Sequence, residues 1–267
     1  KLKLNIRKEM KHIGKSQKEK KTYSENETMI IVNNNVYDIK LWDYYKKKGA
    51  NKIITWTSLT EEDPILLSYF FRSFDEMPKL EQKALKLSKG KVLDVGCGAG
   101  SHSLYLQNKM KLEVFGIDHS PGAIATANAR GLKNTIEQSI FNYKEEIFDT
   151  ILLLMNGPGI CGKLKNLRGL LIHLASLLDY GGQILLDSSD LIYLFDQTEN
   201  GERIVPASNY YGELEYGISY GNKTITFPWL YIDIENLKQA ASEVGLITHI
   251  IMRGENWDYL ARLVKEC

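Results

Sequence analysis

Residues 91–101 read KVLDVGCGAGS, and this stretch decides the fold class. Its first residues alternate as a β-strand does, and Ser101–Asn108 predicts the helix that follows. Three glycines lie between them: Gly96, Gly98 and Gly100. Here the backbone can approach a ligand closely, and the helix N-terminus offers unpaired N–H groups. Asp118 ends the next expected strand, LEVFGID, where an acidic side chain accepts hydrogen bonds from ribose hydroxyls. The pattern predicts a nucleoside-binding site.

The segments around this motif alternate between strands and helices. Further strands are expected at NTIEQS, FDTILLLM and QILLDSS, and helices at residues 120–131 and 166–179. Such alternation over about 100 residues predicts an α/β fold with a doubly wound parallel sheet. After Asp190 the pattern changes to a β-hairpin at 210–227, a helix at 232–245 capped by Asp233, and two final strands at 246–253 and 258–265.

The N-terminal part predicts a helical segment. YDIKLWDYYKKKGA predicts a short helix ended by Gly49. DPILLSYFFRSF predicts a second helix, with Asp63 as N-cap and Pro64 at its first position. A third helix is expected from Pro78 to about Leu87. We therefore divide the chain into a tail (1–22), an N-terminal helical or lid segment (23–77), and a main domain (78–267) with a lid insertion at about 191–231.

Composition and charge restrict the class of protein. The chain has 267 residues, of which 43% are hydrophobic, and this excludes wholesale disorder. It has no apolar run of about 18 residues and no signal-peptide stretch, so we expect a soluble, cytoplasmic protein without a membrane partner. Three scattered cysteines, Cys97, Cys161 and Cys267, form neither a disulfide framework nor a zinc pattern, so we expect no metal.

The charge is concentrated at the N-terminus. Residues 1–22 hold nine Lys or Arg against two Glu, a net charge of +7, which leaves −6 for the rest of the chain. The tail could contact nucleic acid, but we interpret it as a solvated, disordered leader. The acidic remainder argues against a nucleic-acid partner, which would require a basic face.

The motif VLDVGCGAG resembles motif I of the class I S-adenosylmethionine (SAM)-dependent methyltransferases, D-x-G-x-G-x-G, at every fixed position. FDTILLLMNG resembles the strand 4 of that family, and LLDYGGQILLDSS resembles the stretch entering its strand 5. The resemblance covers about residues 78–267. It implies a mostly parallel seven-stranded sheet with an antiparallel C-terminal strand, and SAM as the cofactor.

The resemblance also implies which residues bind the cofactor. In the family the acidic residue that closes strand 2 holds the ribose, and Asp118 matches it. Where the family often has an acidic residue near the adenine, this chain has Ser139, or Gln138 one residue earlier, and Ile140 follows. Asn156 and His119 are candidates for catalysis, with no general base assigned. The full expected set is Asp94, Gly96, Cys97, Gly98, Gly100, Asp118, His119, Ser139, Ile140, Met155 and Asn156.

Substrate residues are expected outside the glycine motif. Arg72 is a candidate partner for a carboxylate of the cofactor or the substrate. The insertion after strand 5 is rich in aromatics, and we expect at least one of four to line the cavity next to the methyl: Tyr210, Tyr211, Trp229 and Tyr231. The polar run Asp187–Asp190 is interpreted as turn and cap chemistry.

The sequence therefore predicts a SAM-dependent methyltransferase that acts on a small-molecule acceptor. Two alternatives are a protein or RNA methyltransferase guided by the basic tail and a nicotinamide-dependent oxidoreductase, although the third fingerprint glycine of the latter is missing. A non-catalytic binder is a third. The acceptor, the methylated atom and the oligomeric state stay open.

Overall fold

The larger of two sheets forms the body of the molecule. The computed structural model describes residues 37–48, 51–207, 209–221 and 223–265. This sheet has the order β10-β11-β7-β6-β3-β4-β5. Its strands are β3 (Lys91–Val95), β4 (Glu113–Asp118), β5 (Asn134–Glu137), β6 (Phe148–Leu153), β7 (Leu178–Ser189), β10 (Leu246–Arg253) and β11 (Asp258–Lys265). β11 runs antiparallel to both neighbours, and the pairs among β3–β7 are parallel. The expected seven-stranded α/β fold is confirmed.

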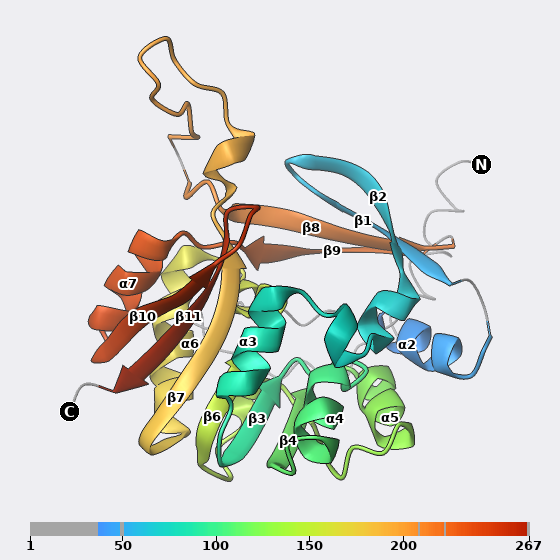
Figure 1. Cartoon of the computed structure of the whole chain (residues 1–267). Coiled ribbons are helices and arrows are strands. Elements are labelled where there is room, and N and C mark those ends of the chain that lie inside the picture. Colours follow the sequence, from blue (N-terminus) through green and yellow to red (C-terminus); the bar gives the residue numbers. More distant parts are fainter. Residues whose placement is uncertain (1–36, 49–50, 208, 222, 266–267) are drawn as a thin grey trace, which may run out of the picture.

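Helices cover both faces of this sheet (Figure 1). α3 (Lys79–Leu87) and α4 (Ser101–Asn108) pack on the face that includes Val92 and Leu185. α6 (Leu164–Ser176) and α7 (Ile234–Ser242) pack on the opposite face, which includes Leu93 and Leu186. Because neighbouring residues of a strand point to opposite faces, the continuous apolar runs in β3, β6 and β7 supply both cores. α5 (Pro121–Ala129) lies beside α4, and α2 (Tyr37–Tyr45) packs on α5.

The strand order places a binding site at one edge of the sheet. From β3 the chain continues outward through β4 and β5, and then returns to the other side of β3 for β6 and β7. Open α/β sheets bind their ligands at such a switch point, outside the carboxyl ends of the strands. The loops after β3, β4, β6 and β7 meet there.

A second, antiparallel sheet lies across these carboxyl ends (Figure 1). It has the order β2-β1-β8-β9 and comprises β1 (Lys52–Thr57), β2 (Thr60–Leu66), β8 (Glu213–Tyr220) and β9 (Lys223–Leu230). β8 and β9 form the expected hairpin. β1 joins it edge to edge, with Ile54 opposite Ser219. Two segments far apart in the sequence thus build one cover over the site.

The prediction of a helix that begins after Asp63 is wrong. Asp63 and Pro64 lie in β2, where Pro64 pairs with Ile54. A proline is tolerated there because β2 is an edge strand whose outer side needs no hydrogen bonds. Two 3₁₀ helices follow, η1 (Leu67–Phe71) and η2 (Phe74–Glu76), before α3 begins. The N-terminal segment is therefore only partly helical.

Other expected elements are found close to their predicted ends. Ser120 caps α5 by accepting a hydrogen bond from Ala123 N, and Asp233 caps α7. β7 starts earlier than expected and includes the turn Gly181-Gly182. The basic tail 1–22 lies outside the described residues. Within the described part of the chain, no helix combines the length and apolar character needed to cross a membrane.

Candidate cofactor and acceptor site

The glycine loop between β3 and α4 leaves open space for a ligand. Gly96, Gly98 and Gly100 all have positive φ, at 72°, 53° and 78°. A Cβ on Gly96 would meet nothing within 4 Å, and one on Gly98 would meet only the Gly96 carbonyl oxygen at 4.0 Å. A Cβ on Gly100 would lie 3.2 Å from Ala127 Cβ of α5. The first two glycines therefore border free space, and the third lets two helices pack closely.

Asp118 joins this loop to the end of β4. Its Oδ2 accepts a hydrogen bond from Gly98 N at 3.0 Å, and its Oδ1 accepts one from Ser120 N at 2.9 Å. The carboxylate is therefore held beside the glycine loop, as the sequence predicts for a ribose-binding acid. His119 is half-exposed, with its Nδ1 3.7 Å from Asp118 Oδ1.

Two other expected residues of the motif have internal roles. Asp94 is buried, and its Oδ2 accepts a hydrogen bond from Ser103 Oγ at 2.6 Å, which ties β3 to α4. Burial raises the pKa of the Cys97 thiol well above its usual value, and the carboxylates of Asp118 and Asp94 raise it further. Cys97 therefore stays a neutral thiol that fills space.

The end of β5 lies beside the end of β4. Gln138 N donates to Asp118 O at 3.0 Å. Ser139 then begins η3 (Ile140–Asn142), and Ile140 is buried with its carbonyl oxygen 2.7 Å from His173 Nε2. Ser139 and Ile140 thus follow the strand next to Asp118, where the resemblance places the adenine.

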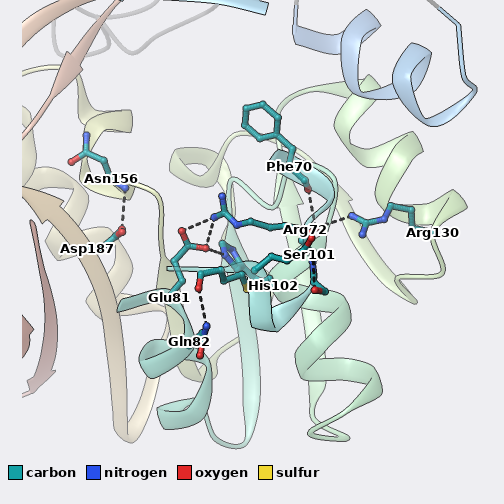
Figure 2. Close-up of polar contacts among 12 residues, drawn as sticks. Phe70, Arg72, Glu81, Gln82, Ser101, His102, Arg130, Asn156 and Asp187 are labelled. Atoms are coloured by element: carbon teal, nitrogen blue, oxygen red, sulfur yellow. Dashed lines mark hydrogen bonds and ion pairs between the residues drawn. The ribbon is translucent and has the colours of Figure 1, made fainter. Parts of the chain in front are cut away.

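A buried charged triad joins Arg72, Glu81 and His102 (Figure 2). Arg72 Nη2 donates to both carboxylate oxygens of Glu81, each at 2.5 Å, and His102 Nε2 lies 2.6 Å from Glu81 Oε2. Their side chains are only 6%, 4% and 11% exposed. The Tyr69 ring stacks on the guanidinium, 3.7 Å from its centre. The triad connects α3 and α4 to the residue that follows η1.

The triad also sets the charge of its members. Burial disfavours the charged form of Glu81, but the hydrogen bond and charge of His102 and the charge of Arg72 outweigh it and lower the Glu81 pKa. Burial likewise opposes the charge of His102, but Glu81 and Asp94 raise its pKa. Sequence analysis identified Arg72 but missed Glu81, which is an acid on the buried face of α3.

One guanidinium nitrogen of Arg72 is unpaired within the described part of the chain. Arg72 Nη1 is buried and has no hydrogen-bond partner among the described residues. Buried polar atoms are nearly always paired in native proteins, and a guanidinium suits a carboxylate. The open glycine loop and the Asp118 carboxylate together fit a nucleoside ligand such as SAM.

Asn156 ties the end of β6 to two other strands. Met155 and Asn156 both have positive φ, which turns the chain sharply into η4 (Gly157–Cys161). Asn156 N donates to Asp187 Oδ1 at 3.0 Å, and its Nδ2 donates to Leu230 O at 3.0 Å. Its Oδ1 accepts from Ser188 Oγ at 2.5 Å. Both polar atoms of its side chain are therefore engaged within the protein.

Asp187 lies next to this junction at the end of β7 (Figure 2). Burial and, to a smaller extent, the charge of the nearby Glu81 carboxylate raise its pKa to about 7, against the lowering effect of the hydrogen bond from Asn156. In the polar run 187–190, Asp190 does act as a cap, because its Oδ1 accepts from Ile192 N of η5 (Leu191–Leu194). Asp187 caps no helix among the described elements. The sequence offered no signal to separate these two acids.

The aromatic side chains of the insertion have different roles. The Trp229 ring lies directly on η4, since a Cβ on Gly159 would come 2.1 Å from it. Tyr210 donates to Asp233 Oδ2 at 2.6 Å, and Tyr211 donates to Asp190 Oδ1 at 2.7 Å. Tyr231 is within electrostatic reach of Asp187. Of the expected four, Trp229 therefore lies at the turn after β6, and Tyr211 and Tyr231 lie near the acids at the end of β7.

Residues 86–251 match the family model described as a methyltransferase domain. The fold is similar to that of a SAM-dependent methyltransferase from Bacteroides fragilis, solved with S-adenosyl-L-homocysteine, with a TM-score of 0.81 and 36% identity over 91% of this chain and 100% of that one. No curated protein sequence matches.

Two more distant structures share the fold. One is the CcbJ methyltransferase from Streptomyces caelestis, with a TM-score of 0.55 and 15% identity over 73% of this chain and 95% of that one. The other is a sugar N-methyltransferase from Streptoalloteichus, with a TM-score of 0.51 and 16% identity over 74% of this chain and 88% of that one.

Proposed function

Because the chain belongs to the class I SAM-dependent methyltransferases, we propose that it methylates a small-molecule acceptor in a site closed by the second sheet. The observation that carries the proposal is the cover itself: β1, β2, β8 and β9 lie across the carboxyl ends of the larger sheet (Figure 1). A small molecule fits under such a cover more readily than a folded macromolecule does. The sugar N-methyltransferase, which shares the fold, also acts on a small molecule.

The cofactor residues follow from the geometry of the loop. Asp118 binds the ribose hydroxyls, Gly96 and Gly98 leave room for the backbone to approach the nucleoside, and Ser139 with Ile140 borders the adenine. Arg72 Nη1 binds the carboxylate of the amino-acid end. SAM supplies a methyl group that its sulfonium makes electrophilic.

The remaining residues position the acceptor. Methyl transfer to an activated electrophile depends mainly on the alignment of the nucleophile, so a rigid, closed site is the main contribution of the protein. Asn156 holds the ends of β6, β7 and β9 together and is a positioning residue, since both polar atoms of its amide are bound within the protein. Trp229 and Tyr231 exclude water from the acceptor side.

The acceptor class is tested with radiolabelled SAM. A lysate is separated into its proteins, nucleic acids and small molecules, and each fraction is incubated with the enzyme. We expect label in the small-molecule fraction alone, and label in proteins or RNA would refute the proposal. Trp229→Ala should impair that turnover and leave S-adenosylhomocysteine affinity within about threefold, or roughly 0.65 kcal/mol. Tyr180→Ala, at the exposed turn at the other end of the sheet, is the control.

The role of Arg72 is tested with two ligands. S-adenosylhomocysteine carries the amino-acid end, and 5′-methylthioadenosine lacks it. Arg72→Lys keeps a charge but loses the planar fork, so it should weaken binding of the first ligand at least about tenfold and leave the second nearly unchanged. Equal losses for both ligands would show that Arg72 supports the fold rather than the carboxylate.

A further inference from the structure

Asp187 is a carboxylate at the acceptor side of the site with a role still unassigned. It lies at the carboxyl end of β7, opposite Leu260 of β11 and next to the turn after β6. The Asn156 N–H holds its Oδ1 in place at 3.0 Å. A fixed carboxylate at the strand ends, beside the turn that follows β6, is in position to touch an acceptor.

Five groups around Asp187 come from different parts of the chain. Glu81 of α3 and His102 of α4 act on it electrostatically, and these two are already bound to each other at 2.6 Å. The charge of Asp187 in turn raises the pKa of Tyr231, which follows β9, and the pKa of Tyr259 in β11. The fifth is the backbone N–H of Asn156. The positive group that acts on Asp187 is therefore already neutralised by another acid.

Aromatic side chains lie within electrostatic reach of the same region. Burial raises the pKa of Tyr231, and Tyr216, Tyr193 and Asp187 raise it further, so these groups share one region. Tyr216 in turn packs against Trp229, with 6.3 Å between ring centres. Among the described residues Asp187 forms no salt bridge, and a carboxylate of this kind next to aromatic faces attracts an organic cation. A neutral hydroxyl or thiol acceptor carries no positive charge, so the carboxylate and the aromatic rings would not attract it in this way.

We propose that the acceptor is a small amine, and that Asp187 binds its ammonium form beside Tyr231 and takes the proton that the nitrogen loses. The proposal rests on the small-molecule function above and names its substrate class. The ammonium gives one proton to the Asp187 carboxylate. The lone pair that this frees forms the N–C bond while the C–S bond breaks and its electrons stay on sulfur. The methylated amine then carries the positive charge, and Asp187 returns its proton to water.

The protonation behaviour of Asp187 agrees with this role. Because burial raises its pKa to about 7, the free protein holds a carboxyl group that is roughly half protonated near neutral pH. An ammonium ion alongside favours the ionised form. A base with a pKa close to the working pH is also the most effective one for accepting a proton.

The binding half of the proposal is tested with benzylamine and benzyl alcohol, which differ mainly in charge. Each is titrated calorimetrically into protein saturated with S-adenosylhomocysteine. We expect benzylamine to bind at least about tenfold more tightly and to release up to about half a proton near pH 7, seen as a buffer-dependent enthalpy. Asp187→Asn should remove both effects. Asp179→Asn, at the opposite, exposed end of the same strand, should change neither.

The catalytic half is tested with labelled SAM and a panel of amines, alcohols, phenols and thiols. We expect label in amines alone. We also expect kcat/KM to rise with pH through about 7, and this limb should disappear in Asp187→Asn. Equal binding of the two probes, no binding of benzylamine, or an amine rate unaffected by Asp187→Asn would overturn the proposal. Label in alcohols alone would overturn it and keep the small-molecule function, whereas label in macromolecules would overturn that function. S-adenosylhomocysteine affinity within about threefold of wild type shows that the variant is folded.

Discussion

Replacing Glu81 by glutamine tests whether the buried triad holds the N-terminal elements on the main domain. Glu81 receives two hydrogen bonds from Arg72 and one contact from His102, and its side chain is 4% exposed. A glutamine at this position would keep the size of the side chain and one acceptor oxygen. Its NH₂ group would face a cation where an oxygen stood, and Arg72 would lose its counter-charge.

The expected loss of stability follows from that geometry. Each charge-assisted hydrogen bond contributes about 1.5–3 kcal/mol, but the glutamine retains part of the set. Removing one partner of a buried ion pair costs about 3–5 kcal/mol, and we adopt this range. For a chain of this length about 1 kcal/mol corresponds to about 2–4 °C, so Tm should fall by roughly 6–20 °C.

The loss should also depend on pH. The pKa of His102 is raised above 6.5, so its contribution is complete below about pH 6.5 and disappears as the pH rises through the raised value. The pKa of Glu81 is lowered below 4.5, so its contribution is complete above about pH 4.5 and disappears as the pH falls through the lowered value. The difference in Tm between wild type and Glu81→Gln should therefore be largest between these values.

Scanning calorimetry of the ligand-free protein measures this difference. The difference in Tm between wild type and Glu81→Gln should become smaller toward about pH 9. It should not vanish, because Arg72 keeps its charge when His102 has lost its own. Glu235→Gln is the control, since Glu235 forms an exposed pair with Lys238 and should leave Tm nearly unchanged. A fall in Tm smaller than about 2 °C, or one that is the same at every pH, would refute the reasoning.

Three further predictions concern the cofactor loop and the cover. Asp118→Ala should weaken S-adenosylhomocysteine binding at least about tenfold in calorimetry, because the substitution removes the hydrogen-bond acceptor for the ribose and leaves the Gly98 N–H without its partner. Unchanged binding would refute the assignment of Asp118 to the ribose. Gly98→Val should abolish that binding, since the side chain would occupy the open space at a φ of 53°; normal binding would mean that the loop has been misread. Gly159→Ala should displace Trp229 and reduce acceptor turnover with cofactor affinity unchanged, while Gly169→Ala, where a Cβ meets nothing within 4 Å, should keep full activity.

Sequence alone was sufficient for the larger sheet and its cofactor loop. Local features of residues 91–101 are enough to predict their structure. The alternating residues form a strand, the glycines permit positive φ in the loop, and a helix follows directly. Asp118 is found by counting, because consecutive parallel strands end at the same edge. These features depend on contacts between residues close in sequence, so a local pattern predicts them.

Only the tertiary structure decided the cover and the charged groups beneath it. Asp63 and Pro64 have the local signature of a helix start, but pairing with β1, which itself pairs with β8, makes them part of a strand. The pairing of β1 with β8 joins segments that are far apart in the chain, and no local pattern contains that information. The role of Glu81 likewise depends on the fold, because α3 places its carboxylate against Arg72 and His102. Asp187 differs from Asp190 only because one faces α3 and the other caps η5; burial and neighbouring charges, which the fold creates, set their chemistry.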